Sequence, residues 1–100
     1  MATTTKALAR GAFATGSATL YTVPASTTTV VSNIAITNTS ASSRTFTLGL
    51  AGTSLHTTTS IAANSTVYID LKQVLTATQT ITGLASAVDV NYHISGVEIS

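Results

Sequence analysis

β-Branched residues dominate this chain, because Thr, Val and Ile together supply 37 of its 100 residues. Their side chains lose rotamer freedom in a helix and pack well on a pleated surface. Leu, Ile, Val and Phe make up 25 residues and the formal net charge is only +1, so the chain can bury a core instead of remaining disordered. A chain of this length has room for one core. The sequence therefore predicts a single all-β domain.

Alternation of apolar and polar residues, which is typical of a half-buried strand, recurs along the chain. It is clearest over residues 45–50, 66–71 and 88–95. Pro24 follows the apolar run Leu20–Val23 and marks a strand end or an edge, because proline cannot donate a ladder hydrogen bond. About seven short strands, with turn signals roughly every 8–12 residues, predict a small antiparallel β-sandwich of the jelly-roll or Ig-like type.

Three segments depart from simple alternation. Within Thr29–Asn38, apolar residues fall on both parities, which predicts a strand covered on one face by the second sheet and on the other by a partner. Gly96 interrupts the last strand and predicts a bulge. The strand over residues 66–71 is expected to end with the polar residues of Asp70–Gln73, and a turn of helix over Leu71–Leu75 is the alternative considered there.

The first 18 residues are rich in small side chains, and their only sizeable apolar residues are Leu8 and Phe13. We expect residues 1–18 to form an extended N-terminal arm and residues 19–100 to form the β-sandwich domain. Terminal segments are commonly loose unless they are tied down. The arm, which carries Lys6 and Arg10, is therefore either a partly ordered tail or a segment that packs on a neighbouring subunit.

Charge is scarce, since the chain has only seven Asp, Glu, Lys and Arg residues where an ordinary domain of this length has about 25. No charged residue occurs from Gly11 to Ser43 or from Thr45 to Ile69. Nucleic-acid affinity depends on several basic contacts to phosphate, so we expect no nucleic-acid partner. Either hydroxyl groups cover an exposed surface, or a permanent assembly with charge-depleted interfaces buries it. We favour the assembly, in which copies of the chain or a host lattice cover the strand edges.

The sequence also shows no means of membrane insertion or export. No apolar run approaches the roughly 18 residues that span a bilayer, and Met1–Ser17 has no apolar region typical of a secretory signal. Cysteine is absent, so neither a disulfide framework nor a cysteine zinc site is expected. We therefore expect no membrane partner.

Groups suited to catalysis or metal binding are few. The two histidines, His56 and His93, lack the spacing of a metal-binding pair. No Gly-x-Ser-x-Gly sequence frames a nucleophile, and the six glycines are dispersed rather than gathered in a phosphate loop. We expect no enzyme activity and no catalytic, cofactor-binding or metal-binding residue.

Two weaker patterns concern carbohydrate. The tyrosines Tyr21, Tyr68 and Tyr92 are candidates for a sugar-binding platform, but their scatter favours edge or interface positions. The sequences Asn38-Thr39-Ser40 and Asn64-Ser65-Thr66 match the glycosylation sequon. Such matches are expected by chance in a chain with 22 Thr and 12 Ser.

The longest distinctive stretch runs from Leu20 to Leu50. A Leu-Tyr-Thr-Val-Pro-Ala segment leads into a Val/Ile-rich strand that ends in Asn, and a polar turn and a second strand follow. The chain then has a strand beginning with Ile-Ala-Ala-Asn-Ser-Thr-Val and closes on Ile-Ser-Gly-Val-Glu-Ile. In these features it resembles a group of small virion structural proteins of tailed bacteriophages, over about 80 residues that exclude the arm. The matching segments are Leu20–Ala25, Val30–Asn38, Ser40–Arg44, Thr45–Leu50, Ile61–Leu71 and Ile94–Ile99.

The resemblance implies a β-sandwich subunit of a phage particle located in the virion. We expect a capsid decoration, or cement, protein on the capsid surface, which forms a homotrimer and binds the major capsid protein or another virion subunit. Its arm, Ala2–Ala18, would contact the lattice, and many weak contacts would add up by multivalency. The alternatives are a structural component of the tail, baseplate or fibre, and a surface module that binds a glycan or receptor.

Overall fold

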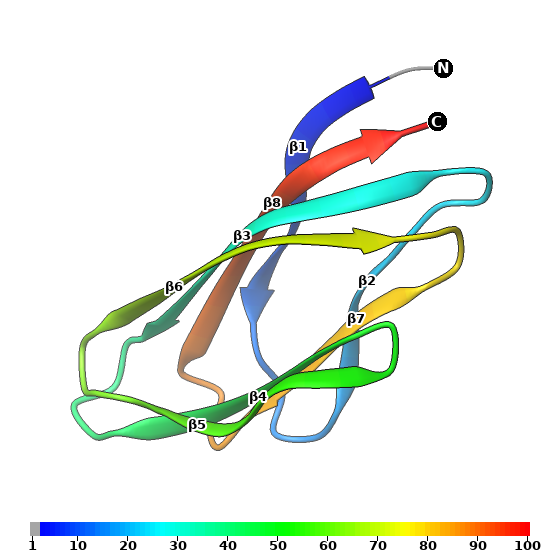
Figure 1. The fold of residues 1–100 in the computed structure, drawn as a ribbon. Helices are drawn as coiled ribbons and strands as arrows, with labels where there is room; N and C mark the ends of the chain where they lie inside the picture. Colours follow the sequence, from blue (N-terminus) through cyan, green and yellow to red (C-terminus); the bar gives the residue numbers. More distant parts are fainter. Residues whose placement is uncertain (1–2) are drawn as a thin grey trace.

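The computed structural model describes residues 3–100, and within this range the chain forms eight β-strands and no helix. The strands form two four-stranded antiparallel sheets, which we call sheet A (order β1-β8-β3-β6) and sheet B (order β2-β7-β4-β5). Figure 1 shows the two sheets as the layers of a sandwich. The strands are β1 (Thr3–Ala12), β2 (Ala18–Thr22), β3 (Thr28–Asn38), β4 (Arg44–Leu50), β5 (Thr53–Ile61), β6 (Thr66–Leu75), β7 (Thr80–Ala85) and β8 (Val90–Ile99).

The connectivity is that of one long antiparallel hairpin rolled into two layers. Within this hairpin, from its tip outward, β4 pairs with β5, β3 with β6, β2 with β7 and β1 with β8. Rolling the hairpin up adds two further pairs, β8 with β3 in sheet A and β7 with β4 in sheet B. At the tip, Ala51 and Gly52 both have positive φ, as in the two-residue turns that match the twist of flanking strands. The predicted all-β sandwich is confirmed, and its topology is the jelly roll.

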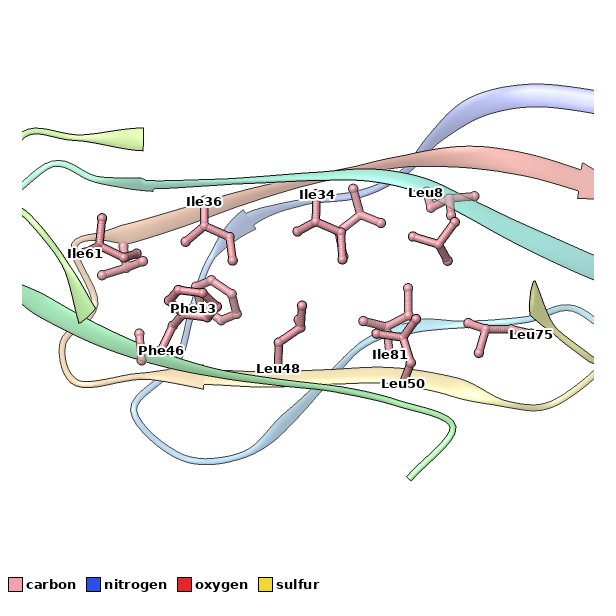
Figure 2. Packing of buried hydrophobic residues seen from close by; sticks show 14 of the residues in the cluster. Leu8, Phe13, Ile34, Ile36, Phe46, Leu48, Leu50, Ile61, Leu75 and Ile81 are labelled. Atoms are coloured by element: carbon pink, nitrogen blue, oxygen red, sulfur yellow. The ribbon is translucent and has the colours of Figure 1, made fainter. Parts of the chain in front are cut away.

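Both sheets contribute side chains to one core. Figure 2 shows Ile34 and Ile36 of β3 facing Phe46 and Leu48 of β4 across the space between the layers. All four side chains have no solvent exposure. The other buried apolar residues are Leu8, Phe13, Val23, Val31, Leu50, Ile61, Leu75, Ile81, Ala85, Val90 and Ile94.

The N-terminal segment differs from the arm expected over residues 1–18. From Thr3 to Ala12 it is the edge strand β1, which pairs with β8 along its whole length. Leu8 is 9% exposed and Phe13 is 1% exposed. Backbone pairing and these two side chains attach the segment, although it lacks the apolar alternation of an ordinary half-buried strand. Met1 and Ala2, also assigned to the arm, lie outside the described residues.

In the single chain the second sheet buries one face of β3, as expected, and coverage of the other face by a partner stays a prediction. The apolar residues of both parities do not require such a partner. Val31 and Ile34 both point into the core, although they differ in parity. The reason is a register shift between Val31 and Asn33 against both neighbouring strands. The extra residue, Ser32, moves the inward positions from odd to even numbers, as a β-bulge does.

Register shifts occur near Gly96 in all the strand pairings of sheet A. Ser95 and Gly96 of β8 are adjacent, whereas their partners in β3 are separated by one residue, and the corresponding residues of β6, Asp70 and Gln73, are separated by two. On the other side, β1 has its own extra residue, Leu8. The bulge predicted at Gly96 therefore lies in the strands around it, where extra residues increase the local twist. Strand β6 continues to Leu75, so both the predicted strand end at Asp70–Gln73 and the turn of helix over Leu71–Leu75 are wrong.

Gly96 is required at this crossing by close backbone approach. A Cβ atom at position 96 would lie 2.3 Å from the carbonyl oxygen of Val30 and 2.9 Å from Cδ1 of Leu8. We expect Gly96→Ala to lower the free energy of unfolding by about 1–3 kcal/mol, the usual cost of overpacking, as measured by urea denaturation. Gly16→Ala is the matched control, since nothing lies within 4 Å of a Cβ there. Equal stability of the two variants would contradict this explanation.

Candidate functional site

Surface charge is distributed very unevenly between the two sheets. Sheet B carries one charged residue, Arg44, at the start of β4. In β7, buried residues alternate with the half-buried Thr80, Thr82 and Leu84, which form part of the outer face. Thr82 lies between Thr19 of β2 and Gly49 of β4. The outer face of sheet B is thus a charge-free surface rich in hydroxyl groups, and we take this face as the candidate interaction surface.

One end of the sandwich is held by a carboxylate that connects both sheets. Glu98 of β8 accepts a hydrogen bond from the Tyr21 hydroxyl of β2, and its Oε1 lies 3.3 Å from the Lys6 Nζ of β1. The Tyr21 hydroxyl is also 2.9 Å from Thr29 Oγ1 of β3, a fully buried side chain. Here polar contacts replace the apolar core.

These contacts shift two pKa values. The hydrogen bond from Tyr21 lowers the pKa of Glu98, and Lys6 lowers it further. Burial raises the pKa of Tyr21 to about 12, with a further contribution from Glu98. Both shifts favour the protonation states in which a neutral Tyr21 donates to an ionised Glu98.

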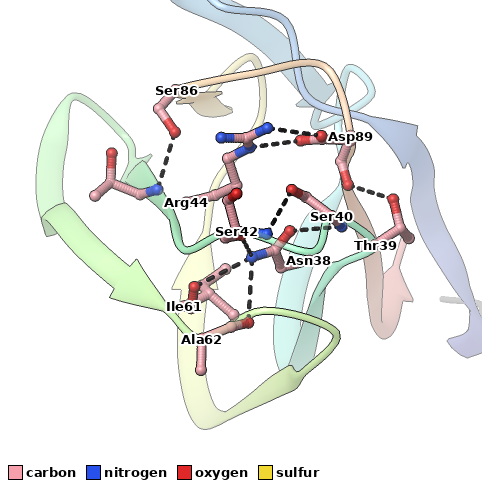
Figure 3. A network of polar contacts seen from close by, with 10 residues as sticks. Asn38, Thr39, Ser40, Ser42, Arg44, Ile61, Ala62, Ser86 and Asp89 are labelled. Carbon is pink, nitrogen blue, oxygen red and sulfur yellow. Dashed lines mark hydrogen bonds and ion pairs between the residues drawn. The ribbon is translucent and has the colours of Figure 1, made fainter.

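The opposite end is closed by a second polar cluster around Asn38 (Figure 3). Asn38 is fully buried, and its Nδ2 donates to the carbonyl oxygens of Ser42 at 2.8 Å, Ile61 at 3.2 Å and Ala62 at 3.2 Å. Its Oδ1 accepts from the Ser40 amide at 2.9 Å. One side chain thereby joins the loop after β3 to the end of β5. Its amide nitrogen is fully engaged, which argues against the sequon at Asn38 as a glycosylation site.

A bidentate ion pair lies beside this cluster. The Arg44 Nε donates to Asp89 Oδ1 at 3.0 Å, and the Arg44 Nη2 donates to Asp89 Oδ2 at 3.1 Å. The Arg44 guanidinium lowers the pKa of Asp89. The backbone oxygen of Asp89 also accepts from Thr39 Oγ1 at 2.7 Å. The pair holds the loop before β8 against the start of β4, which is a structural role.

The two histidines lie in different sheets. His56 of β5 packs its ring against Phe46 at a centroid distance of 5.4 Å, whereas His93 is an exposed residue of β8 opposite Ala35 and Arg10. Among residues 3–100, no group of three or more His, Cys, Asp or Glu side chains could hold a metal ion. The same residues include no helix long and apolar enough to cross a membrane. The expected lack of catalytic and cofactor residues stays a prediction.

The three tyrosines form no common platform. Tyr21 joins the Glu98 cluster, and Tyr92 packs against Phe13 at a centroid distance of 4.9 Å. Only Tyr68 is well exposed, at 70%. Tyr21 and Tyr68 lie on the edge strands β2 and β6, as predicted, whereas Tyr92 lies on the internal strand β8. An interface role for these tyrosines stays a prediction.

A hollow of about 550 Å³ lies where β6 bulges away from β3. Its lining residues are Ser32, Asp70, Leu71, Lys72 and Gln73. Sequence reasoning missed this hollow, because it arises where β6 has two residues and β3 has only one between the same two paired positions. The alternation of β6 nevertheless predicted that Asp70 lies on the solvent side, which is confirmed by its exposure.

Comparison with known proteins gives few matches. No protein-family profile matches the chain, and no curated protein matches it. Solved structures that are similar include two crystal structures of pentameric capsid proteins isolated from metagenomic phage sequences. Each is 13% identical and is matched over 90% of this chain, with TM-scores of 0.38 and 0.30. This chain spans about 60% of the length of those capsid proteins.

The Glu98 cluster makes stability depend on pH. Because the folded-state pKa of Glu98 lies below its ordinary value of 4.5, its contribution is complete above that value and is lost as the pH falls below about 4.5. We expect Glu98→Gln to lower the free energy of unfolding by about 1.5–3 kcal/mol at pH 7, as for a hydrogen bond to a charged group. The difference from wild type should shrink toward pH 3, as measured by urea denaturation across this range.

Tyr21→Phe is the companion variant, because it keeps the Glu98 charge and removes the hydrogen bond that lowers its pKa most. It should also reduce the loss of stability in acid. The Arg44–Asp89 pair retains its own acid dependence in both variants, since the pKa of Asp89 is lowered too. An unchanged acid dependence in Glu98→Gln would contradict this account of the cluster.

Proposed function

We propose that this chain is a structural protein of a bacteriophage virion that acts by binding other subunits. The observation that carries the proposal is the outer face of sheet B, which is free of charge, because Arg44, the one charged residue of its strands, is at the start of β4 on the inward parity and is paired with Asp89. Interface cores are depleted of charge, and covering hydroxyl groups costs less than covering ions. The resemblance of residues 20–99 to small virion proteins of tailed phages supplies the kind of particle. The jelly roll agrees with this class, since capsid proteins are among those built on it.

Within the virion we favour a capsid decoration protein on the head surface, assembled as a homotrimer on the major capsid protein. Each copy would add a modest interface, and the summed contacts of an oligomer would hold it on the shell. The lattice contact first assigned to an arm is reassigned to the face of sheet B. Thr3–Ala12 is part of sheet A, and deleting it would remove an edge strand.

A tail, baseplate or fibre component is the second candidate. The elongated shape of the chain, 45 × 21 × 18 Å, suits stacking along a tail as well as lying on a shell. Both candidates use intersubunit contacts and no catalytic residue. Binding to isolated heads and to isolated tails separates them.

We expect Thr82→Lys to weaken binding to particles of the parent phage assembled without this chain by at least about tenfold, since each 1.4 kcal/mol is tenfold in affinity. The variant places a charge in the centre of the sheet B face and leaves the core unchanged. Cosedimentation of labelled protein with purified heads, and separately with tails, measures the affinity. Binding to tails alone would favour the second candidate, and binding to neither would refute the virion role.

Asn91→Lys is the matched control, because it adds the same charge to the exposed outer face of sheet A. It should bind as wild type does. Thermal unfolding of both variants checks that the sandwich is intact. Equal weakening by the two substitutions would show that net charge, and not the face of sheet B, determines binding.

A further inference from the structure

The sandwich has four edge strands, and they differ in how they are protected against pairing with another chain. The edges are β1 and β6 in sheet A and β2 and β5 in sheet B. Edge strands present unpaired N–H and C=O groups that can bind another strand. Strand β2 has five residues with Pro24 just beyond it. The pairing of β5 with β4 is irregular at two places, and the pairing of β6 with β3 is irregular at one place, Leu71 and Lys72. Strands β1 and β6, each of ten residues, are the long edges.

Strand β6 presents an ordered row of side chains on the outer face of sheet A. Tyr68 and Val74 are 70% and 60% exposed, which places them among the most exposed large apolar residues of the described chain. Between them lie Asp70 and Lys72, which are also exposed. The order along the strand is therefore aromatic, acidic, basic and aliphatic, with Leu71 at its centre.

This row is complementary to itself when it is reversed. If two β6 strands pair antiparallel about a twofold axis at Leu71, residues equally distant from Leu71 on either side face each other. Asp70 then faces Lys72 of the second copy, and Tyr68 faces Val74 of the second copy. Opposite charges and aromatic–aliphatic contacts across neighbouring strands are both stabilising. A twofold contact forms each pair twice.

We propose that β6 is a contact between two copies of this chain, formed by antiparallel pairing about Leu71. The four strands of sheet A would continue into the sheet A of the second copy. The Tyr68 ring would lie on the Val74 side chain of the other copy. Beside Val74, the register of sheet A places Val30 and then Val97 in the same row, so the ring has an apolar surface to cover.

The other long edge lacks this complementarity. An antiparallel pair of β1 strands centred on Leu8 would place Lys6 opposite Arg10 of the second copy, and like charges directly opposite each other are destabilising. Strand β5 has no charged residue, so no charge pair would select a register for it. Among the described edges, β6 therefore combines exposed apolar groups with self-matching charge.

The inference goes beyond the proposed function, because it concerns the chain alone in solution and names the surface that a second copy occupies. It is also compatible with a homotrimer, since a twofold contact through β6 would join one trimer to another. Loss of the twofold contact would turn a dimer into monomers, or a pair of trimers into single trimers, and the mass would halve in both cases.

The test is a charge reversal measured by sedimentation equilibrium over a range of protein concentrations. Lys72→Glu places a carboxylate opposite Asp70 of the second copy in both pairs, and it leaves the Asn33–Asp70 hydrogen bond intact. We expect the dissociation constant of the twofold contact to rise by at least about tenfold, so that the mass falls by half at intermediate concentration. Raising the salt concentration should weaken the wild-type contact as well.

Arg10→Glu is the matched control, because it changes the net charge by the same amount at the opposite edge of the same sheet. It should associate as wild type does. The double variant Asp70→Lys with Lys72→Asp restores an opposite-charge pair across the axis and should recover association. Thermal unfolding confirms that each variant is folded.

Three results would overturn the inference: a wild-type chain that stays monomeric at all concentrations, equal effects of Lys72→Glu and Arg10→Glu, and a double variant as weak as the single one. The proposed function has a separate readout, which is binding to phage heads or tails. A chain that binds heads but whose self-association ignores Lys72→Glu refutes the β6 contact alone. A chain that pairs through β6 but binds neither heads nor tails refutes the virion role alone.

Discussion

Strand β8 runs between β1 and β3 with its alternation unbroken, so its neighbours must absorb the curvature of sheet A. They do this by adding residues at one level, one in β1, one in β3 and two in β6. Gly96 permits the crossing, because the Val30 carbonyl occupies the space of a side chain. On one side of this level lie the inward residues Ile34 and Ile94, which are fully buried. On the other side the two sheets are joined by Glu98 and Tyr21 instead.

Four of the seven charged residues lie where the apolar core ends. Lys6 and Glu98 form an ion pair at one end of the sandwich, and Arg44 and Asp89 form one at the other. Both carboxylates have a lowered pKa because hydrogen bonds favour their ionised forms. Among residues 3–100, no buried side-chain nitrogen or oxygen lacks a hydrogen-bond partner. The chain therefore builds a complete sandwich with seven charged residues, since hydroxyl and amide groups supply most of its polar contacts.

The sequence predicted those parts of the fold in which a strand keeps one alternation from end to end. The inward residues of β4 and β8, such as Phe46 and Ile94, were identified in this way, and the turn after Leu50 was correct. The failures lie in sheet A, where bulges occur. In β3 the extra residue Ser32 changes which parity points inward, so the sequence pattern resembled that of a strand with two apolar faces. In β1 the extra residue Leu8 and the small side chains around it mimicked an arm.

The two candidate interaction surfaces were harder to predict, because they depend on register between strands that are distant in sequence. Composition predicted a charge-poor surface, but it could not locate that surface on sheet B. That assignment required knowing that β2, β4, β5 and β7 share one sheet. Likewise, Tyr68 and Val74 have an alternating pattern in the sequence, but their row continues to Val30 and Val97 only through the pairing of β6, β3 and β8.

The two outer faces consequently meet water in different ways. Sheet A carries five of the seven charged residues in its strands, and sheet B carries Arg44 alone. Charged groups resist burial because removing their hydration costs several kcal/mol or more, whereas a hydroxyl costs less and can regain its hydrogen bond from a partner. Covering sheet B in an assembly therefore carries only a small free-energy cost of desolvation. An assembly that covers sheet A has to pair its ions, and only an arrangement that places each charge opposite its complement meets that requirement.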